Sequence, residues 1–269
     1  MASLLERVKN KLPVPLIRTL FPASSPLLDL PWQMLDAREW RQWRRVLVVA
    51  PHQDDESLGC GGLIARLRAG GQEISVVFIS DGSGSHRNSA SYPPERLKAL
   101  REREAVTALG ILGVDARAVT FLGLRDRFVP FPGDPAFEDA VDRFCRYWQA
   151  RPADTVLLPW RHDPARDHQA SWHIAHAALS RVAPETRVLE YPIWAWVDPP
   201  KPLANDTPVW RLDIRDLRRR KRRAIRAHRS QTTKLIRDDK TCFRLSRLMQ
   251  ANFDQTWELF FETGPARRS

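Results

Sequence analysis

The sequence is poor in cysteine and lacks long apolar runs, and both features limit where the protein works. The three cysteines, Cys60, Cys145 and Cys242, are far apart and odd in number, which favours a reducing compartment over a disulfide framework. A membrane-spanning helix needs about 20 apolar residues, whereas charges and prolines interrupt the apolar N-terminal segment, unlike a signal peptide. We therefore expect a cytoplasmic protein, either free or peripheral to the membrane.

Acidic residues are fewer than basic ones, and the glycines lack a nucleotide-binding pattern. Asp and Glu number 32 against 43 Lys and Arg, which gives a net charge of +11 and a surface that attracts anions. The glycines after the first apolar run lack the G-x-G-x-x-G spacing, and the acids before them would repel a pyrophosphate, so a dinucleotide is excluded. What the chain does have is a hydrophobic fraction of 43% and ten tryptophans, which indicate a packed globular protein.

The apolar runs and the helical periodicity alternate along the chain. Five runs predict strands at residues 46–50, 74–79, 118–122, 155–158 and 187–196. Helical spacing between them predicts helices at 58–69, 94–112, 135–150 and 167–182. This order is typical of an α/β fold, a mostly parallel sheet with helices on both faces and a site at the C-terminal strand ends. We expect an N-terminal arm at 1–40, a core at 41–200 and a basic helical C-terminal extension at 201–269 packed on the same domain.

A dense group of ionisable residues follows the first predicted strand. Residues 48–56 read Val-Val-Ala-Pro-His-Gln-Asp-Asp-Glu, and three adjacent carboxylates repel one another unless a cation lies among them. His52 and Asp55 could then face one metal ion while Asp54 faces its open position. The alternative is an acidic helix N-cap made by Asp54, Asp55 and Glu56, and the two interpretations are compatible.

A second group follows the fourth predicted strand, at residues 160–168, and contains His162, Asp163, Asp167 and His168. His168 together with His52 and Asp55 would complete a set of two histidines and one carboxylate, which suits catalytic zinc. Trp160 lies beside these histidines in the sequence, where it could line a pocket or pack in the core.

These residues, with four further motifs, resemble the PIG-L/LmbE-like family of zinc-dependent N-deacetylases over about residues 45–235. The further motifs are Gly61-Gly62, Ser80-Asp81-Gly82, Arg101-x-x-Glu104 before Leu109-Gly110, and His228-x-Ser230-Gln231. The resemblance implies a Rossmann-like fold and a hydrolase that removes the acetyl group from an N-acetylglucosamine-type sugar, either free or linked to a nucleotide or lipid.

The resemblance also implies roles for individual residues. His52, Asp55 and His168 would bind Zn²⁺, and Asp54 would act as the general base on a zinc-bound water. Arg101 matches a family arginine in or beside the substrate pocket, although a surface ion pair with Glu104 is equally consistent with its spacing. Asp81, which follows the second strand, and Trp160 are the further candidates for substrate binding.

The sequence departs from the family at one position of its histidine motif. The motif reads His-x-Asp-His, and its first histidine is thought to stabilise the oxyanion or protonate the leaving amine; here that position is Ala165. We expect His162 or His228 to supply this catalytic function. The alternative is a catalytically impaired relative that binds a glycan or an anionic surface.

A cationic run extends from Arg211 to Arg229. It is either a solvated face or a contact for an anionic phosphate or an acidic membrane surface. Nucleic acid is disfavoured as a partner because the run is not interleaved with aromatic residues that could stack on bases.

Overall fold

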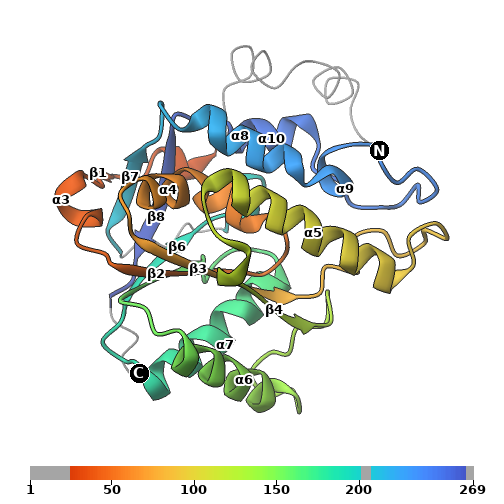
Figure 1. Ribbon diagram of the computed structural model, residues 1–269, viewed down its shortest axis with the longest axis horizontal. Helices are drawn as coiled ribbons and strands as arrows, with labels where there is room; N and C mark the ends of the chain where they lie inside the picture. The colour runs from red at the N-terminus through yellow and green to blue at the C-terminus, as the bar shows by residue number, and fades with distance from the viewer. Residues whose placement is uncertain (1–24, 201–206, 265–269) are drawn as a thin grey trace.

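The computed structural model describes residues 25–200 and 207–264, which form one sheet covered by helices (Figure 1). The sheet has eight strands in the order β1-β7-β8-β6-β5-β2-β3-β4. In chain order they are β1 (Gln33–Met34), β2 (Arg45–Ala50), β3 (Glu73–Ser80), β4 (Val119–Leu124), β5 (Thr155–Pro159), β6 (Arg187–Tyr191), β7 (Val209–Asp213) and β8 (Trp257–Glu262). Strand β8 runs antiparallel to both β6 and β7, and the other pairings are parallel. The expected mostly parallel α/β fold is confirmed.

Helices cover both faces of the sheet (Figure 1). The described helices are α3 (Ala37–Trp40), α4 (Asp55–Ala69), α5 (Pro94–Leu112), α6 (Phe137–Ala150), α7 (Arg166–Val182), α8 (Arg218–Ala227), α9 (Arg229–Thr232) and α10 (Arg247–Phe253), with short 3₁₀ turns at Pro26–Leu28, Ala116–Ala118 and Trp194–Trp196. Helices α4, α5 and α8 pack together on one face, and α6 packs with α7 on the other.

Strand β2 shows how the sequence builds these two layers. Val46, Val48 and Ala50 belong to the core under α4 and α5, whereas Leu47 and Val49 belong to the core under α6 and α7. Successive side chains of a strand point to opposite faces, so a continuous apolar run is what a strand buried on both faces requires.

Helix α5 has the boundaries expected from its sequence. It begins at Pro94, where a missing N–H costs nothing, and ends before Gly113, whose φ of 98° is left-handed. The acidic group does begin α4, with Asp54 at the N-cap and Asp55 and Glu56 in the first turn, but the side chain of Asp54 makes no capping hydrogen bond.

The structure differs from the sequence-based expectation in the fifth apolar run, in the C-terminal segment and in the N-terminal arm. The fifth apolar run forms a strand only to Tyr191 and then turns into the 3₁₀ helix Trp194–Trp196. The segment expected to be a helical extension does contain α8, α9 and α10, but β7 and β8 also add to the central sheet. Residues 1–24 of the expected N-terminal arm lie outside the described part, and its residues 33–34 form the edge strand β1.

Among residues 25–200 and 207–264, none of the helices combines the length and apolarity that a membrane crossing requires.

The connection order places the carboxyl ends of β2 and β5 side by side at a switch point. The chain proceeds from β2 outward to β3 and β4, and then returns so that β5 pairs with the other edge of β2. In open α/β sheets ligands bind in the crevice that such a reversal leaves.

Candidate active site

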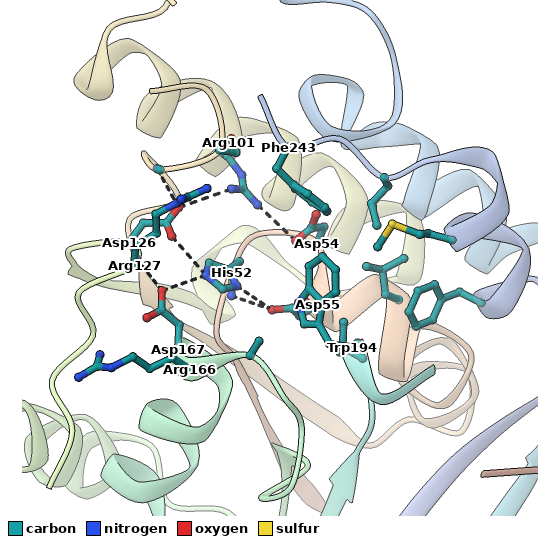
Figure 2. Close-up of a pocket in the computed structure, with 18 residues that line it drawn as sticks. His52, Asp54, Asp55, Arg101, Asp126, Arg127, Arg166, Asp167, Trp194 and Phe243 are labelled. Atoms are coloured by element: carbon teal, nitrogen blue, oxygen red, sulfur yellow. Dashed lines mark hydrogen bonds and ion pairs between the residues drawn. The ribbon is translucent and has the colours of Figure 1, made fainter. Parts of the chain in front are cut away.

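A cavity of about 400 Å³ opens at the carboxyl edge of the sheet, next to this switch point (Figure 2). The loops after β2, β3, β4, β5 and β6 all contribute to its lining, which agrees with the site expected at the C-terminal strand ends. The charged residues of the lining are His52, Asp54, Asp55, Arg101, Asp126, Arg127, Arg166 and Asp167.

His52, Asp55 and His168 meet beside the cavity, and their nitrogen and oxygen atoms lie within 4.8 Å of one another. Oδ2 of Asp55 lies 3.3 Å from Nδ1 of His52 and 3.3 Å from Nε2 of His168. In a tetrahedral zinc site with bonds of about 2.0 to 2.1 Å, neighbouring ligand atoms lie about 3.3 to 3.4 Å apart. The three side chains therefore have the spacing of zinc ligands.

His168 carries the clearest indication that a cation belongs in this group. Its ring is fully buried, yet neither ring nitrogen makes a hydrogen bond within the described structure. A buried polar atom without a partner is costly, and a metal ion bound by Nε2 would remove that cost. Nδ1 lies 3.4 Å from Oδ1 of Asp163, which is the arrangement of a carboxylate that orients a metal-binding histidine.

Asp126 and Asp167, two carboxylates to which the sequence assigned no role, lie close to Nε2 of His52. Nε2 lies 3.4 Å from Oδ1 of Asp126 and 3.3 Å from Oδ2 of Asp167 (Figure 2). Although burial opposes the charged form, Asp126 and its neighbours raise the pKa of His52 well above its ordinary value. His52, Asp126 and Asp167 could also hold an ion, but this set leaves His168 unsatisfied, so Asp126 and Asp167 fit better as groups that orient His52.

Asp54 lies in the same cavity beside the guanidinium of Arg101. Its Oδ1 lies 3.3 Å from Nη2 of Arg101, and both side chains are buried. Burial raises the pKa of Asp54 to about 7, although Arg101 acts in the opposite direction. A carboxyl group with such a pKa can both take up and release a proton near neutral pH.

Arg101 does not form the surface ion pair that its spacing to Glu104 allowed. It is buried and also donates to the backbone oxygens of Gln53 and Gly82. Glu104 instead accepts hydrogen bonds from the backbone N–H and the hydroxyl of Ser230. The Arg-x-x-Glu motif thus serves the cavity at one end and fixes the C-terminal segment at the other.

Besides His168, which lies beside the cavity, four sequence-predicted site residues do not line it. Asp81 accepts hydrogen bonds from Ser83 within its own loop. Trp160 is buried and stacks on Phe261 with ring centroids 4.5 Å apart, so it packs in the core. His162 is exposed, and its ring meets that of Trp160 in an edge-on contact.

His228, the fourth, is fully buried and points its Nε2 at Oε1 of Glu56, 3.1 Å away. Although burial acts against it, Glu56 raises the pKa of this histidine. His228 therefore joins α8 to the start of α4 under the site, while Ala165 itself lies in the cavity lining.

The residues Arg211–Arg229 divide into internal and external sets. Lys221 forms a buried ion pair with Glu258, and Arg218 and Arg222 pair with Asp254. A second set is exposed and has no acidic partner among the described residues, and it consists of Arg219, Arg223, Arg226 and Arg229. We call this second set the arginine stripe.

The fold and the site define a class of protein. It is an α/β protein whose sheet carries, at its carboxyl edge, two histidines and an aspartate with the spacing of metal ligands, the metal-type centre, and a buried carboxyl group beside them. The chain belongs to the PIG-L family. The family profile described as GlcNAc-PI de-N-acetylase matches residues 47–179, and the resemblance seen in the sequence is confirmed.

Named relatives agree with this assignment. A probable N-acetyl-α-D-glucosaminyl L-malate deacetylase 2 of Bacillus subtilis is 30% identical over 197 residues, which cover 72% of this chain and 86% of the relative. Diacetylchitobiose deacetylase of Thermococcus kodakarensis is 28% identical over 196 residues, 70% of each chain. The structure of N,N'-diacetylchitobiose deacetylase from Pyrococcus horikoshii shares the fold, with a TM-score of 0.58 and 23% identity over 87% of this chain and 82% of that one.

Proposed function

We propose that this protein is a zinc-dependent deacetylase that hydrolyses the acetamide of an N-acetylglucosamine-type sugar to a free amine and acetate. The observation that carries the proposal is the fully buried His168, whose ring nitrogens lack hydrogen bonds beside Asp55 and His52. The named relatives are deacetylases of N-acetylated sugars, which supports the same reaction here.

His52, Asp55 and His168 would hold the zinc ion, and Asp163, Asp126 and Asp167 would orient the two imidazoles. Zinc would supply Lewis acidity, which polarises an amide carbonyl and makes water more acidic. Two histidines and one carboxylate leave coordination positions open for water and substrate. The burial of these side chains keeps their geometry fixed, which is what catalysis by positioned groups requires.

Asp54 would take the proton from the attacking water and return it to the departing nitrogen. Both transfers need a group with a pKa near the working pH, and burial raises the pKa of Asp54 to about 7 in the metal-free protein. If Asp54 makes both proton transfers, no separate histidine is needed to protonate the nitrogen, which would explain why Ala165 can replace the family's histidine. Arg101, which contacts Asp54, would fix the carboxyl group and contribute to substrate binding.

Acetate release distinguishes this function from that of an impaired, glycan-binding relative. Chelated protein, alone and with zinc restored, would be assayed on free, nucleotide-linked and lipid-linked N-acetylglucosamine. Zinc-dependent release from one of these is the expected result. Failure on all three, with zinc bound and sugar retained, would favour the impaired relative.

The same assay tests the two candidate histidines. Because His162 and His228 do not line the cavity, we expect His162→Ala to stay within about twofold of the unchanged protein, a surface substitution being nearly neutral. If either alanine variant keeps zinc and folds but loses turnover, that histidine supplies the function missing at Ala165.

We also propose that the arginine stripe binds an anionic phosphate or an acidic membrane surface. Its members Arg219, Arg223 and Arg226 are spaced four and three residues apart on α8, so they share one helix face. Their exposure and lack of acidic partners in the described residues support this partner.

A further inference from the structure

We propose that the cavity contains a preformed apolar subsite and that the sugar substrate carries an apolar aglycone, an alkyl or aryl group, which fills it. This inference rests on the proposed function, because it concerns the part of the substrate that remains once an acetamide is placed at Asp54 and the His-Asp-His centre. The subsite is the wall of the cavity on the far side of His52 from Asp126 and Asp167. It is formed by Ile193, Trp194, Phe243, Leu245, Met249 and Phe253.

Polar and apolar groups are separated within this single cavity. Figure 2 shows Asp126, Asp167 and their arginine neighbours on one side of His52. Trp194 and Phe243 lie on the other side, next to Asp55 and Asp54. A sugar ring with its hydroxyl groups needs hydrogen-bonding partners, which the charged side offers. The opposite wall offers side chains with no strong donor except the indole of Trp194, so it suits a group that makes no hydrogen bonds.

The apolar wall is built in place by hydrogen bonds of its backbone. Oδ2 of Asp163 accepts N–H groups from Ile193 and Trp194 at 2.9 and 2.8 Å. Because the other oxygen of Asp163 faces Nδ1 of His168, one carboxylate fixes both the metal-type centre and the start of the wall. The wall therefore has a fixed position relative to the reacting groups.

The second half of the wall comes from the C-terminal segment and is fixed in the same way. The N–H of Phe243 donates to the carbonyl of Ser85 at 2.9 Å, and that of Leu245 donates to the carbonyl of Gln231 at 2.8 Å. The rings of Phe243 and Trp194 are 5.2 Å apart. Since these backbone donors are already used, the wall presents mainly carbon to a ligand.

A series of N-acetyl-β-D-glucosaminides with methyl, butyl, hexyl and octyl aglycones tests the subsite. We expect kcat/KM for amine release to rise roughly threefold to fourfold per buried methylene until the wall is filled, mainly through a lower KM. In parallel, calorimetry would measure binding of the same glycosides to the zinc-loaded Asp54→Asn variant, which separates binding from turnover.

Met249 is suited to the matched substitution because it is only half-buried. Met249→Gln should lower the octyl-to-methyl ratio of kcat/KM at least fivefold. The control is Met34→Gln, the same chemical change at an exposed methionine of the edge strand β1, which should leave the ratio unchanged.

The outcomes separate the subsite from the reaction. If octyl and methyl glycosides bind and react equally well, the apolar subsite is refuted while the deacetylase function stands. If the octyl glycoside binds tighter but no glycoside releases acetate, the subsite stands and the proposed function fails. If Met34→Gln lowers the ratio as much as Met249→Gln, the wall is not the binding surface and the inference is overturned.

Discussion

Asp54 combines burial with a neighbouring guanidinium, and the balance between them sets how this carboxyl group exchanges protons. Replacing it by asparagine keeps the shape and removes the proton acceptor. We expect Asp54→Asn to retain zinc and to lose turnover by roughly a hundredfold or more, the usual scale for a general base. Zinc content and kcat would be measured on the same samples, with His168→Ala as the contrasting variant that loses metal. Unchanged turnover would remove Asp54 from the mechanism.

The raised pKa of Asp54 also predicts a pH dependence of stability in the metal-free protein. In the unfolded chain this carboxyl titrates near 4, and in the folded protein near 7. Between these values the folded state binds more protons, so this group's contribution to stability is lost as pH rises through about 7. Asp54→Asn lacks this ionisation. Its stability relative to the unchanged protein should therefore rise by on the order of 2 kcal/mol from pH 5 to pH 8.

Urea unfolding with a chelator present would measure this difference, and saturating zinc provides its control. A bound dication favours the ionised carboxylate, so zinc should largely abolish the effect. A metal-free difference that does not change with pH would mean that Asp54 is already ionised well below pH 7.

Single residues also show which parts of the site the sequence could predict. His52, Asp54 and Asp55 are adjacent in the chain, so their crowding was visible, and His168 followed a strand expected at the same edge. Asp126 could not be given a role from the sequence, because a lone acid in a loop carries no local sign of its partner His52, 74 residues away. Trp160 and His162 were misleading for the opposite reason. They neighbour His168 in sequence, but the turn after β5 sends them to the core and to the surface.

Whole elements divide by the kind of apolar pattern they carry. β2, β3 and β5 are buried on both faces, so their continuous apolar runs predicted them well. Strands β7 and β8 were missed because charged residues interrupt them. Glu258 of β8 is buried, and it accepts hydrogen bonds from the backbone of Gly62 and from Lys221. An inward-facing carboxylate of this kind interrupts the apolar pattern by which a strand is recognised in a sequence.

The close packing of Ile214 against α4 predicts that this helix tolerates no side chain at Gly62. A Cβ there would lie 2.5 Å from Cγ2 of Ile214, whereas a Cβ on Gly110 of α5 would have no neighbour within 4 Å. We expect Gly62→Ala to cost about 1 to 3 kcal/mol by overpacking, and Gly110→Ala to gain roughly 0.5 to 1 kcal/mol from helix propensity. Thermal unfolding would show shifts of opposite sign. A gain at both positions would mean that α4 and the segment after β7 are less closely packed than the structure shows.

Across the whole molecule, part of the excess positive charge lies in ion pairs within the protein and part is exposed to solvent. Lys221, Arg218 and Arg222 are used in ion pairs that attach α8 to the C-terminal segment, whereas the arginine stripe faces solvent. A cationic run in a sequence therefore overstates the surface available to an anion. The distribution of the charge, and not the net value of +11, determines where an anionic partner would bind.

This distribution can be tested by moving the same loss of charge to different places. Each arginine near an anionic bilayer contributes about 1 kcal/mol, so Arg219→Gln/Arg223→Gln should weaken partition onto phosphatidylcholine–phosphatidylserine vesicles roughly thirtyfold. The matched control, Arg38→Gln/Arg117→Gln, removes two exposed arginines that lie in surface ion pairs elsewhere. It should weaken binding much less, because charges beyond a Debye length of about 8 Å are screened at physiological salt. Equal weakening by both variants would show that only net charge matters, and binding equally strong on vesicles without phosphatidylserine would exclude an electrostatic contact.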